Sequence, residues 1–306
     1  MLALTGCAGK IGGAVLNSIL QHSLFPPSKL VVCTSSDPED SRWDWLKAQE
    51  VSIRRSNYED SDSMLKAFSG CSKLFLVSTP HVHLDFYNSP VGRERHHINA
   101  IQAAQKAGVE HIYYTSLAFG SESTAGVMRA HLRTEEFLKG LTDVKTTILR
   151  EGLYSESWPM YFGYYNLDND ERSEVITAGD GFISWTAIAD LGLATALVLA
   201  DPSQKYAGAT FYLSSPTAHN LKDIALIVSK VEGREIHLKT VSRDQYVEYY
   251  TRMGRDKGSV EWWSTTYAAL EQNECKIADT TLQDLLLSKG IKCKPIEETI
   301  KEMLGG

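Results

Sequence analysis

Apolar residues follow two alternating spacings along the first half of the chain. Short apolar runs, often β-branched, are each followed by a stretch whose apolar positions recur with a helical period, which is typical of βαβ units. Strands are expected at 2–6, 29–35, 51–57, 72–79, 110–116 and 145–151, and helices at 11–20, 44–50, 60–70, 92–108 and 128–140. This order predicts an α/β fold with a doubly wound parallel sheet, whose ligand lies at the carboxyl ends of the strands.

The pattern changes after about residue 151. Residues 153–170 are aromatic-rich and aperiodic, whereas 184–200 is expected to form a helix capped near Asp190. Strands are then expected at 209–215 and 235–242, an amphipathic helix at 220–233, and further helices to the end of the chain. We expect residues 1–152, with about 178–200, to form one domain. Residues 153–177 and 201–306 are expected to form a smaller α+β lobe over the carboxyl edge of the sheet.

Composition excludes several classes of protein. The chain has 306 residues, of which 43% are hydrophobic and 23% charged, and its formal net charge is -7 without a long basic block. This balance argues against a nucleic-acid partner. No apolar run is long enough to span a membrane, and no basic region precedes the apolar start, as a signal peptide would require. Five scattered cysteines without a CxxC pair favour reduced thiols. We therefore expect a cytoplasmic protein, monomeric or homodimeric.

Three glycines lie between the first expected strand and the first expected helix. In "LALTGCAGKIGG", Gly6 permits a tight turn, Gly9 lets the backbone approach a pyrophosphate, and Gly12 lets the helix pack against the strand. The N–H groups and dipole at the helix start favour phosphate oxygens. We therefore interpret the first domain as a Rossmann-type NAD(P)-binding domain, and the second lobe as the substrate lobe.

The end of the second strand favours NADP over NAD. Enzymes that use NAD carry an acidic residue there, whereas this chain has Ser35 and Ser36, followed by Asp37. Hydroxyl groups can donate to a 2′-phosphate, and Arg42 and Lys10 could add positive charge. Alternatively, Asp37 caps a turn before a proline, and Arg42 is only solvated.

Several motifs together resemble those of a known family. "TGCAGKIGG", "HIYYTSLAFG", "MRAHLRTEEFL", "TTILREGLYSESW" and "DTTLQDLLLSKGI" occur in family order over nearly the whole chain. They resemble the NmrA-like group of atypical short-chain dehydrogenases, and among these the bacterial NADPH-dependent quinone oxidoreductases. The resemblance implies a Rossmann domain with a small C-terminal substrate lobe and NADPH in the cleft between them. It leaves function open, because members include reductases, natural-product tailoring enzymes and redox-sensing regulators.

The candidate cofactor-binding residues come from the glycine turn, from the strand ends and from the resemblance. They are Thr5, Gly6, Ala8, Gly9, Lys10, Ile11, Gly12, Ser35, Ser36, Arg42, Asn57, Tyr58, Ser78, Thr79, Thr115, His131, Gly152, Leu153 and Tyr154. The resemblance implies that Asn57 and Tyr58 flank the adenine, and that residues 152–154 run along the nicotinamide. The competing interpretation is that hydroxyl groups at strand ends only cap the turns that follow.

The chain departs from the usual short-chain dehydrogenase at the catalytic position. No lysine follows Tyr113 or Tyr114 at the Tyr-x-x-x-Lys spacing, and His131 stands where related reductases carry their lysine. A histidine titrates near neutrality and could supply the donor that a developing oxyanion needs. Tyr154 and Ser116 are the other candidate catalytic residues. Alternatively, His131 only hydrogen-bonds the nicotinamide ribose or caps its helix.

Aromatic residues cluster after the sixth expected strand. Four of them are candidate substrate-binding residues, namely Trp158, Tyr161, Phe162 and Trp263. They indicate either an apolar pocket for a bulky, flat or polycyclic ligand or simply the core of the lobe. No metal site is expected. No cysteine or carboxylate follows His81 and His83 at ligand spacing, and His96 and His97 are adjacent on a helix and cannot converge on one ion.

Three functions remain open from the sequence. The first is NADPH-dependent reduction, or reversible oxidation, of a quinone or of a bulky aromatic or polycyclic natural product. The second is a tailoring enzyme of secondary metabolism that assists a cyclisation or rearrangement. The third is a regulator that senses NADP(H) without turnover.

Overall fold

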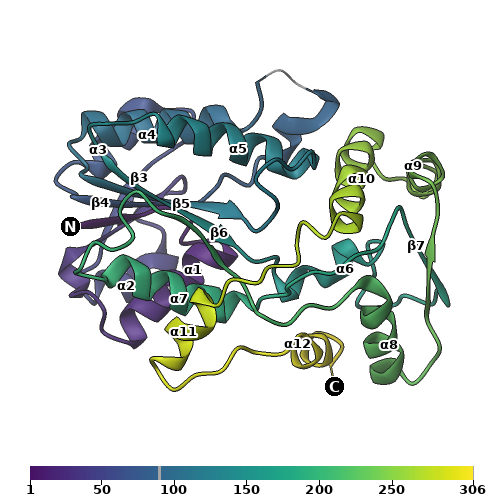
Figure 1. Cartoon of the computed structure of the whole chain (residues 1–306). Helices are drawn as coiled ribbons and strands as arrows, with labels where there is room; N and C mark the ends of the chain where they lie inside the picture. Colours follow the sequence, from purple (N-terminus) through teal and green to yellow (C-terminus); the bar gives the residue numbers. More distant parts are fainter. Residues whose placement is uncertain (89–90, 306) are drawn as a thin grey trace.

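A parallel sheet of seven strands organises the N-terminal part of the chain in the computed structural model, which describes residues 1–88 and 91–305 (Figure 1). The strand order is β3-β2-β1-β4-β5-β6-β8. The bounds are β1 Leu2–Leu4, β2 Leu30–Thr34, β3 Ser52–Arg55, β4 Lys73–Leu76, β5 His111–Leu117, β6 Lys145–Glu151 and β8 Thr210–Leu213. All pairs are parallel, so the predicted doubly wound α/β fold is confirmed.

Helices cover both faces of this sheet (Figure 1). One face carries α1 Lys10–Gln21, α2 Asp44–Lys47, α7 Ile188–Ala200 and α11 Thr281–Leu287, and the other carries α3 Ser61–Phe68, α4 Glu94–Lys106 and α5 Gly126–Lys139. The inner strands β1, β2 and β4 are almost wholly buried, which explains why they are nearly continuous apolar runs. The edge strand β3 is only partly buried. Helices α1 and α7 pack so closely that Gly192 lies directly against Ala14.

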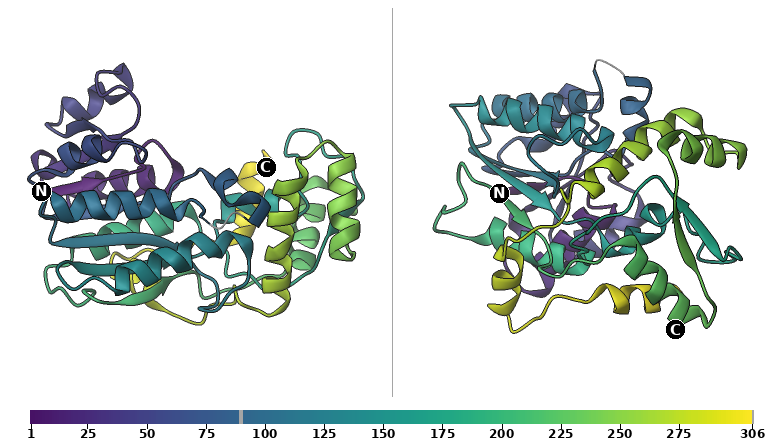
Figure 2. Two further views of the ribbon diagram at one scale, coloured as in Figure 1. Left: turned by 90° about the horizontal axis from the view of Figure 1, so that it is seen from above. Right: turned by 45° about the vertical axis from the view of Figure 1, so that its right-hand side comes forward.

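The remaining elements form a lobe beside the carboxyl edge of the sheet (Figure 2). It contains α6 Trp158–Tyr161, β7 Glu174–Thr177, α8 Leu221–Glu232, β9 His237–Thr240, α9 Arg243–Arg252, α10 Lys257–Glu271 and α12 Ile296–Met303. Strands β7 and β9 pair in parallel as a separate sheet. One core of buried residues, rich in tryptophan and tyrosine, holds the lobe together.

The boundary of the lobe differs from the sequence expectation in two stretches. Residues 201–306 were all expected in the lobe, yet β8 pairs with β6 at the edge of the main sheet. Helix α11 also packs against α7 and buries Leu282 and Leu286 in the core on that face. The sequence could not show this, because pairing with β6 is a long-range contact that a short apolar run does not specify.

Helix α7 and strand β7 also differ from the expected elements. The helix begins at Ile188 after Ala187, so Asp190 lies in its first turn and is not its cap. There its carboxylate accepts a hydrogen bond from the Lys294 backbone N–H at 2.7 Å. Strand β7 lies just beyond the stretch interpreted as aperiodic.

None of the helices in the described ranges combines the length and apolar character needed to cross a bilayer.

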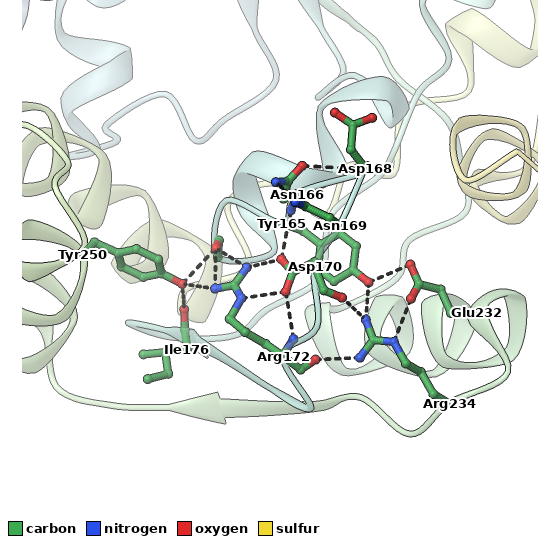
Figure 3. Close-up of polar contacts among 11 residues, drawn as sticks. Tyr165, Asn166, Asp168, Asn169, Asp170, Arg172, Ile176, Glu232, Arg234 and Tyr250 are labelled. Carbon is green, nitrogen blue, oxygen red and sulfur yellow. Dashed lines mark hydrogen bonds and ion pairs between the residues drawn. The ribbon is translucent and has the colours of Figure 1, made fainter.

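Two arginines tie down the loop that follows α6 (Figure 3). Arg172 donates from Nε to Asp170 Oδ1 at 2.9 Å, and Arg234 donates to the Arg172 carbonyl and to the Tyr165 hydroxyl, each at 2.8 Å. Tyr250 donates to the Gly163 carbonyl at 2.9 Å. These bonds anchor residues 163–172 to α9 and to the end of α8, and so hold one side of the aromatic segment in place.

We expect Gly192→Ala to destabilise the protein. A Cβ at this position would lie 2.6 Å from Ala14 Cβ and 2.8 Å from its carbonyl carbon, so α1 and α7 would have to move apart. Overpacking of this kind costs about 1–3 kcal/mol of unfolding free energy, which urea denaturation would measure. The matched control is Gly140→Ala, where φ is −77° and the nearest atom would be 3.5 Å away. Equal stability of the two variants would contradict this packing argument.

Candidate functional site

A cavity of about 540 Å³ lies at the carboxyl ends of the strands. Residues from the ends of β1, β2, β4, β5 and β6 line it, together with residues from the starts of α1 and α5. It coincides with the point where the strand order reverses between β1 and β4, which is where doubly wound sheets bind their ligands.

The glycine turn at one end of the cavity has the shape that a pyrophosphate requires. Gly6 has φ +69°, and a Cβ on Gly12 would lie 2.3 Å from the Gly6 carbonyl oxygen. Gly9 is the N-cap of α1, and neither a side-chain cap nor an acidic residue neutralises the first turn of this helix. The turn therefore offers backbone N–H groups and a positive helix end to phosphate oxygens, and these residues fit a dinucleotide.

The end of β2 presents hydroxyl groups to the same cavity. Ser35 lines the cavity, and the hydroxyl groups of Thr34 and Ser36 hydrogen-bond to each other at 2.8 Å. Arg42 does not reach this point: it pairs with Asp40 at 2.8 Å and is exposed. Asp37 caps a turn by accepting from the Glu39 N–H at 2.9 Å. The competing interpretation of Asp37 and Arg42 therefore describes their positions better than phosphate binding does.

A buried chain of hydrogen bonds leads from the end of β4 to His131. The Thr79 N–H donates to His97 Nε2 at 3.0 Å, so the proton of this neutral ring is on Nδ1, which donates to Thr134 at 2.8 Å. Thr134 in turn donates to the Ala130 carbonyl at 2.7 Å. The Tyr114 hydroxyl lies 3.2 Å from the same His97 Nδ1–H and 2.9 Å from His131 Nδ1, so by accepting from His97 it directs its own proton at His131 Nδ1. This assignment places the His131 proton on Nε2.

The expectation that His131 titrates near neutrality is wrong in this environment. His131 is 2% exposed, and burial, Arg93 and His97 together lower its pKa well below the usual value. The ring is therefore neutral at pH 7 and lines the cavity as a hydrogen-bond donor. A neutral imidazole can polarise an oxygen, but it does not readily release its Nε2 proton.

Ser116 is held by a buried ion pair. Its hydroxyl donates to Glu135 Oε1 at 2.7 Å, and Arg150 Nη2 lies 2.7 Å from the other oxygen of the same carboxylate. Since Ser116 is 1% exposed and its proton is engaged with Glu135, its hydroxyl is poorly placed to donate to a ligand. Ser116 lines the cavity, but the geometry favours a structural role for it.

A second, apolar cavity of about 260 Å³ adjoins the first. Leu117, Val127 and Tyr154 line both cavities, so the two are neighbours across these side chains. The second is walled by Val82, Phe86, Met160, Tyr161, Tyr164, Trp262 and Trp263. Its walls come from the lobe and from the segment 82–88, a distorted helical turn that follows β4.

Most of the predicted residues line one of the two cavities. The first is lined by Thr5, Gly6, Ala8, Gly9, Lys10, Ile11, Ser35, Asn57, Tyr58, Ser78, Thr79, Thr115, Ser116, His131 and Tyr154. Gly152, Leu153, Tyr161 and Trp263 line the second. Gly12, Ser36 and Arg42 line neither, and Trp158 and Phe162 are fully buried in the core of the lobe. For these two aromatic residues the structure favours the core interpretation over substrate contact.

Three residues that the sequence did not single out prove to be well placed. Glu151 and Arg93 line the first cavity and Phe86 lines the second. Glu151 directly precedes Gly152 at a strand end, a position at which polar residues commonly meet a ligand. Arg93 is the N-cap of α4, four residues before His97. Phe86 gave no signal, because it lies in a short irregular segment.

We expect His131 and His97 to stay neutral between about pH 6 and pH 8. Burial lowers the pKa of both rings, so neither should gain a proton in this range. Long-range 1H–15N spectra should show the Nδ1–H tautomer for His97 and the Nε2–H tautomer for His131. In Tyr114→Phe, His131 should lose this preference, whereas His97 should keep it. An imidazolium signal from His131 in this range would overturn the assignment.

Searches with protein-family models give no match for this chain. The chain is 28% identical over 309 residues to the NmrA-like family domain-containing oxidoreductase flvB of Aspergillus flavus, covering 98% of this chain and 94% of that protein. It is 29% identical over 259 residues to quinone oxidoreductase 2 of Escherichia coli, covering 84% of each chain.

Solved structures of related reductases also resemble this chain over nearly its whole length. Triphenylmethane reductase of Citrobacter sp., in complex with NADP(H), has a TM-score of 0.81 at 28% identity, with 99% of each chain covered. The E. coli quinone oxidoreductase QOR2, in complex with NADPH, has a TM-score of 0.82 at 26% identity and the same coverage. Both complexes agree with the predicted cofactor. The resemblance noted in the sequence is thus confirmed: the chain is similar to NmrA-like oxidoreductases and to quinone reductases, and it is an NAD(P)H-dependent oxidoreductase.

Proposed function

We propose that this protein reduces a quinone, or another bulky and flat aromatic or polycyclic acceptor, with NADPH as the hydride donor. The observation that carries the proposal is the pair of adjoining cavities. One offers a glycine turn for a dinucleotide, and the other is apolar and walled by aromatic rings. Tyr154 stands between them. Similarity to reductases whose structures contain NADP(H) or NADPH supports the same cofactor here.

The residues of the first cavity fit the parts of NADPH. The N–H groups of the turn 6–12 would hold the pyrophosphate, and Ser35 would meet the adenosine ribose and its 2′-phosphate. Tyr58 is already oriented, because its hydroxyl donates to the Val77 carbonyl at 2.8 Å. When bound, NADPH supplies a hydride.

The second cavity would orient the acceptor and keep water away. Tyr161 packs edge-on against Trp263, with ring centroids 4.8 Å apart, which gives a rigid wall suited to a planar ring system. As negative charge develops on the acceptor oxygen, the His131 Nε2–H and the Tyr154 hydroxyl are the donors best placed to stabilise it. A small polar substrate would leave this apolar wall unused.

The cofactor preference is tested at Ser35. We expect Ser35→Asp to raise the dissociation constant for NADPH at least about tenfold, since a carboxylate in the cavity wall repels the 2′-phosphate. The dissociation constant for NADH should stay the same or fall, because the carboxylate can accept hydrogen bonds from ribose hydroxyl groups. Quenching of protein fluorescence would measure both constants. Ser35→Asn, without the charge, is the control, and an unchanged preference in Ser35→Asp would speak against the proposed phosphate position.

The reaction itself is tested by following NADPH oxidation with 1,4-naphthoquinone as the acceptor. Phe86 lines the apolar cavity, and its ring centroid lies 5.3 Å from that of Trp262. We expect Phe86→Ala to raise KM for the quinone about tenfold, because the bound quinone would bury less apolar surface, with little change in kcat. Leu226→Ala, an exposed position on α8, is the control. If NADPH binds but no acceptor of a quinone and polycyclic panel is reduced, the reductase function is rejected in favour of a sensor.

A further inference from the structure

Two buried glutamates near the cavity have opposite surroundings. Glu135 is matched by Arg150, whose Nη2 and Nε lie 2.7 and 3.0 Å from its oxygens. Glu151 is equally buried, at 1% exposure, but its contacts are two hydroxyl groups, from Tyr154 at 3.4 Å and from Thr195 at 3.5 Å. Among the described residues, no cation pairs with the Glu151 carboxyl. Pairing with Arg150 therefore explains how the Glu135 carboxylate can be buried. No such pairing explains the burial of Glu151.

A buried carboxyl group without a cation keeps its proton. Burial raises the pKa of Glu151 to about 8, and the hydrogen bonds from Tyr154 and Thr195 only partly oppose this shift. The other titratable groups nearby do not change its state. Arg93 and His131 face the same cavity from α4 and α5, Lys10 faces it from α1, and Glu156 and Tyr161 act on Tyr154. Glu151 is thus mostly protonated at neutral pH.

The position of this proton matters for the chemistry. Glu151 lines the dinucleotide cavity, and Tyr154, its hydrogen-bond partner, lines both that cavity and the apolar one. Tyr154 is therefore in contact both with the buried carboxyl and with the cavity proposed for the acceptor. His131 lies on the same cavity but is neutral, so it can stabilise an oxyanion without supplying the proton that reduction consumes.

We propose that Glu151 stores the proton taken up by the acceptor and that Tyr154 passes it on. This inference rests on the proposed function. The acceptor gains a hydride, which NADPH supplies, and one proton. The Tyr154 O–H bond breaks as the acceptor O–H bond forms, and the Glu151 O–H bond breaks as Tyr154 regains a proton. Glu151 is left as a carboxylate, and it takes up a proton from solvent after the product leaves.

The carboxylate state has a consequence for cofactor binding. Oxidised nicotinamide carries a positive charge and reduced nicotinamide does not, so a Glu151 carboxylate in the cavity favours NADP+ over NADPH. NADP+ binding should therefore release a proton from Glu151 below about pH 8, whereas NADPH binding should leave the proton in place. The ionised form favours NADP+ over NADPH only until solvent restores the proton.

The test measures dissociation constants for NADP+ and NADPH by calorimetry across the pH range, without any acceptor. With wild-type protein, the NADP+ constant should fall relative to the NADPH constant by up to about tenfold per pH unit as pH rises, and level off above about pH 8. The 2′-phosphate titrates near pH 6 in both cofactors, so its contribution cancels in the ratio. In Glu151→Gln the ratio should not depend on pH.

Asp190→Asn is the matched control. Burial also raises the pKa of Asp190, but this residue lines neither cavity, so the variant should keep the wild-type pH dependence. An NADP+ to NADPH ratio that is flat in wild type, or equally pH-dependent in Glu151→Gln, overturns the inference. Absence of binding of both cofactors overturns the proposed function instead.

Turnover gives a second readout. With 1,4-naphthoquinone, kcat should fall above about pH 8 in wild type as Glu151 loses its proton, and Glu151→Gln should be slow at all pH values. Tyr154→Phe should lose at least about tenfold in kcat while keeping the pH-dependent ratio of cofactor binding. Full turnover by Tyr154→Phe would exclude the tyrosine as the link.

Discussion

The site depends first on the pairing of β1 with β4. These two strands lie at the middle of the sheet, where the strand order reverses. Thr5, just beyond β1, donates its backbone N–H to the Phe75 carbonyl at 3.0 Å and accepts from the Val77 N–H through its hydroxyl at 2.8 Å. The chain then leaves β1 toward α1 on one face and leaves β4 toward α4 on the other. Gly6 lies so close to Val77 that a Cβ would approach its Cβ to 2.9 Å. The cavity opens directly above this closely packed junction, because the two connections diverge from it.

The buried Arg93 affects both the protonation of two histidines in the site and the position of one cavity wall. Arg93 pairs through Nε with Asp85 at 3.1 Å and donates to the Val127 carbonyl at 3.0 Å, which ties the segment 82–88 to α5. Its charge also adds to burial in lowering the pKa of His97 and of His131. A buried ion pair is a weak source of stability, so this one is better understood as fixing the position of a wall and the protonation of two histidines.

Features that depend on local sequence were predictable, and those that depend on distant partners were not. The glycine turn and the Ser35 strand end follow from residues adjacent in the chain. By contrast, β8 joins the sheet through β6, and Glu151 keeps its proton because no arginine from another described element reaches it. Trp158 and Trp263 look alike in the sequence. Only the fold decides that the first fills the core while the second faces a cavity.

The segment 82–88 belongs by sequence to the nucleotide-binding domain, yet it closes the apolar cavity of the lobe. Val82 and Phe86 line that cavity, while the Tyr87 hydroxyl donates to Asp256 at 3.1 Å and its ring lies over Gly258 at the start of α10. This one stretch of seven residues therefore touches both parts of the molecule. Substitutions there can alter the shape of the apolar cavity without touching the glycine turn, so the two cavities can be changed independently of each other.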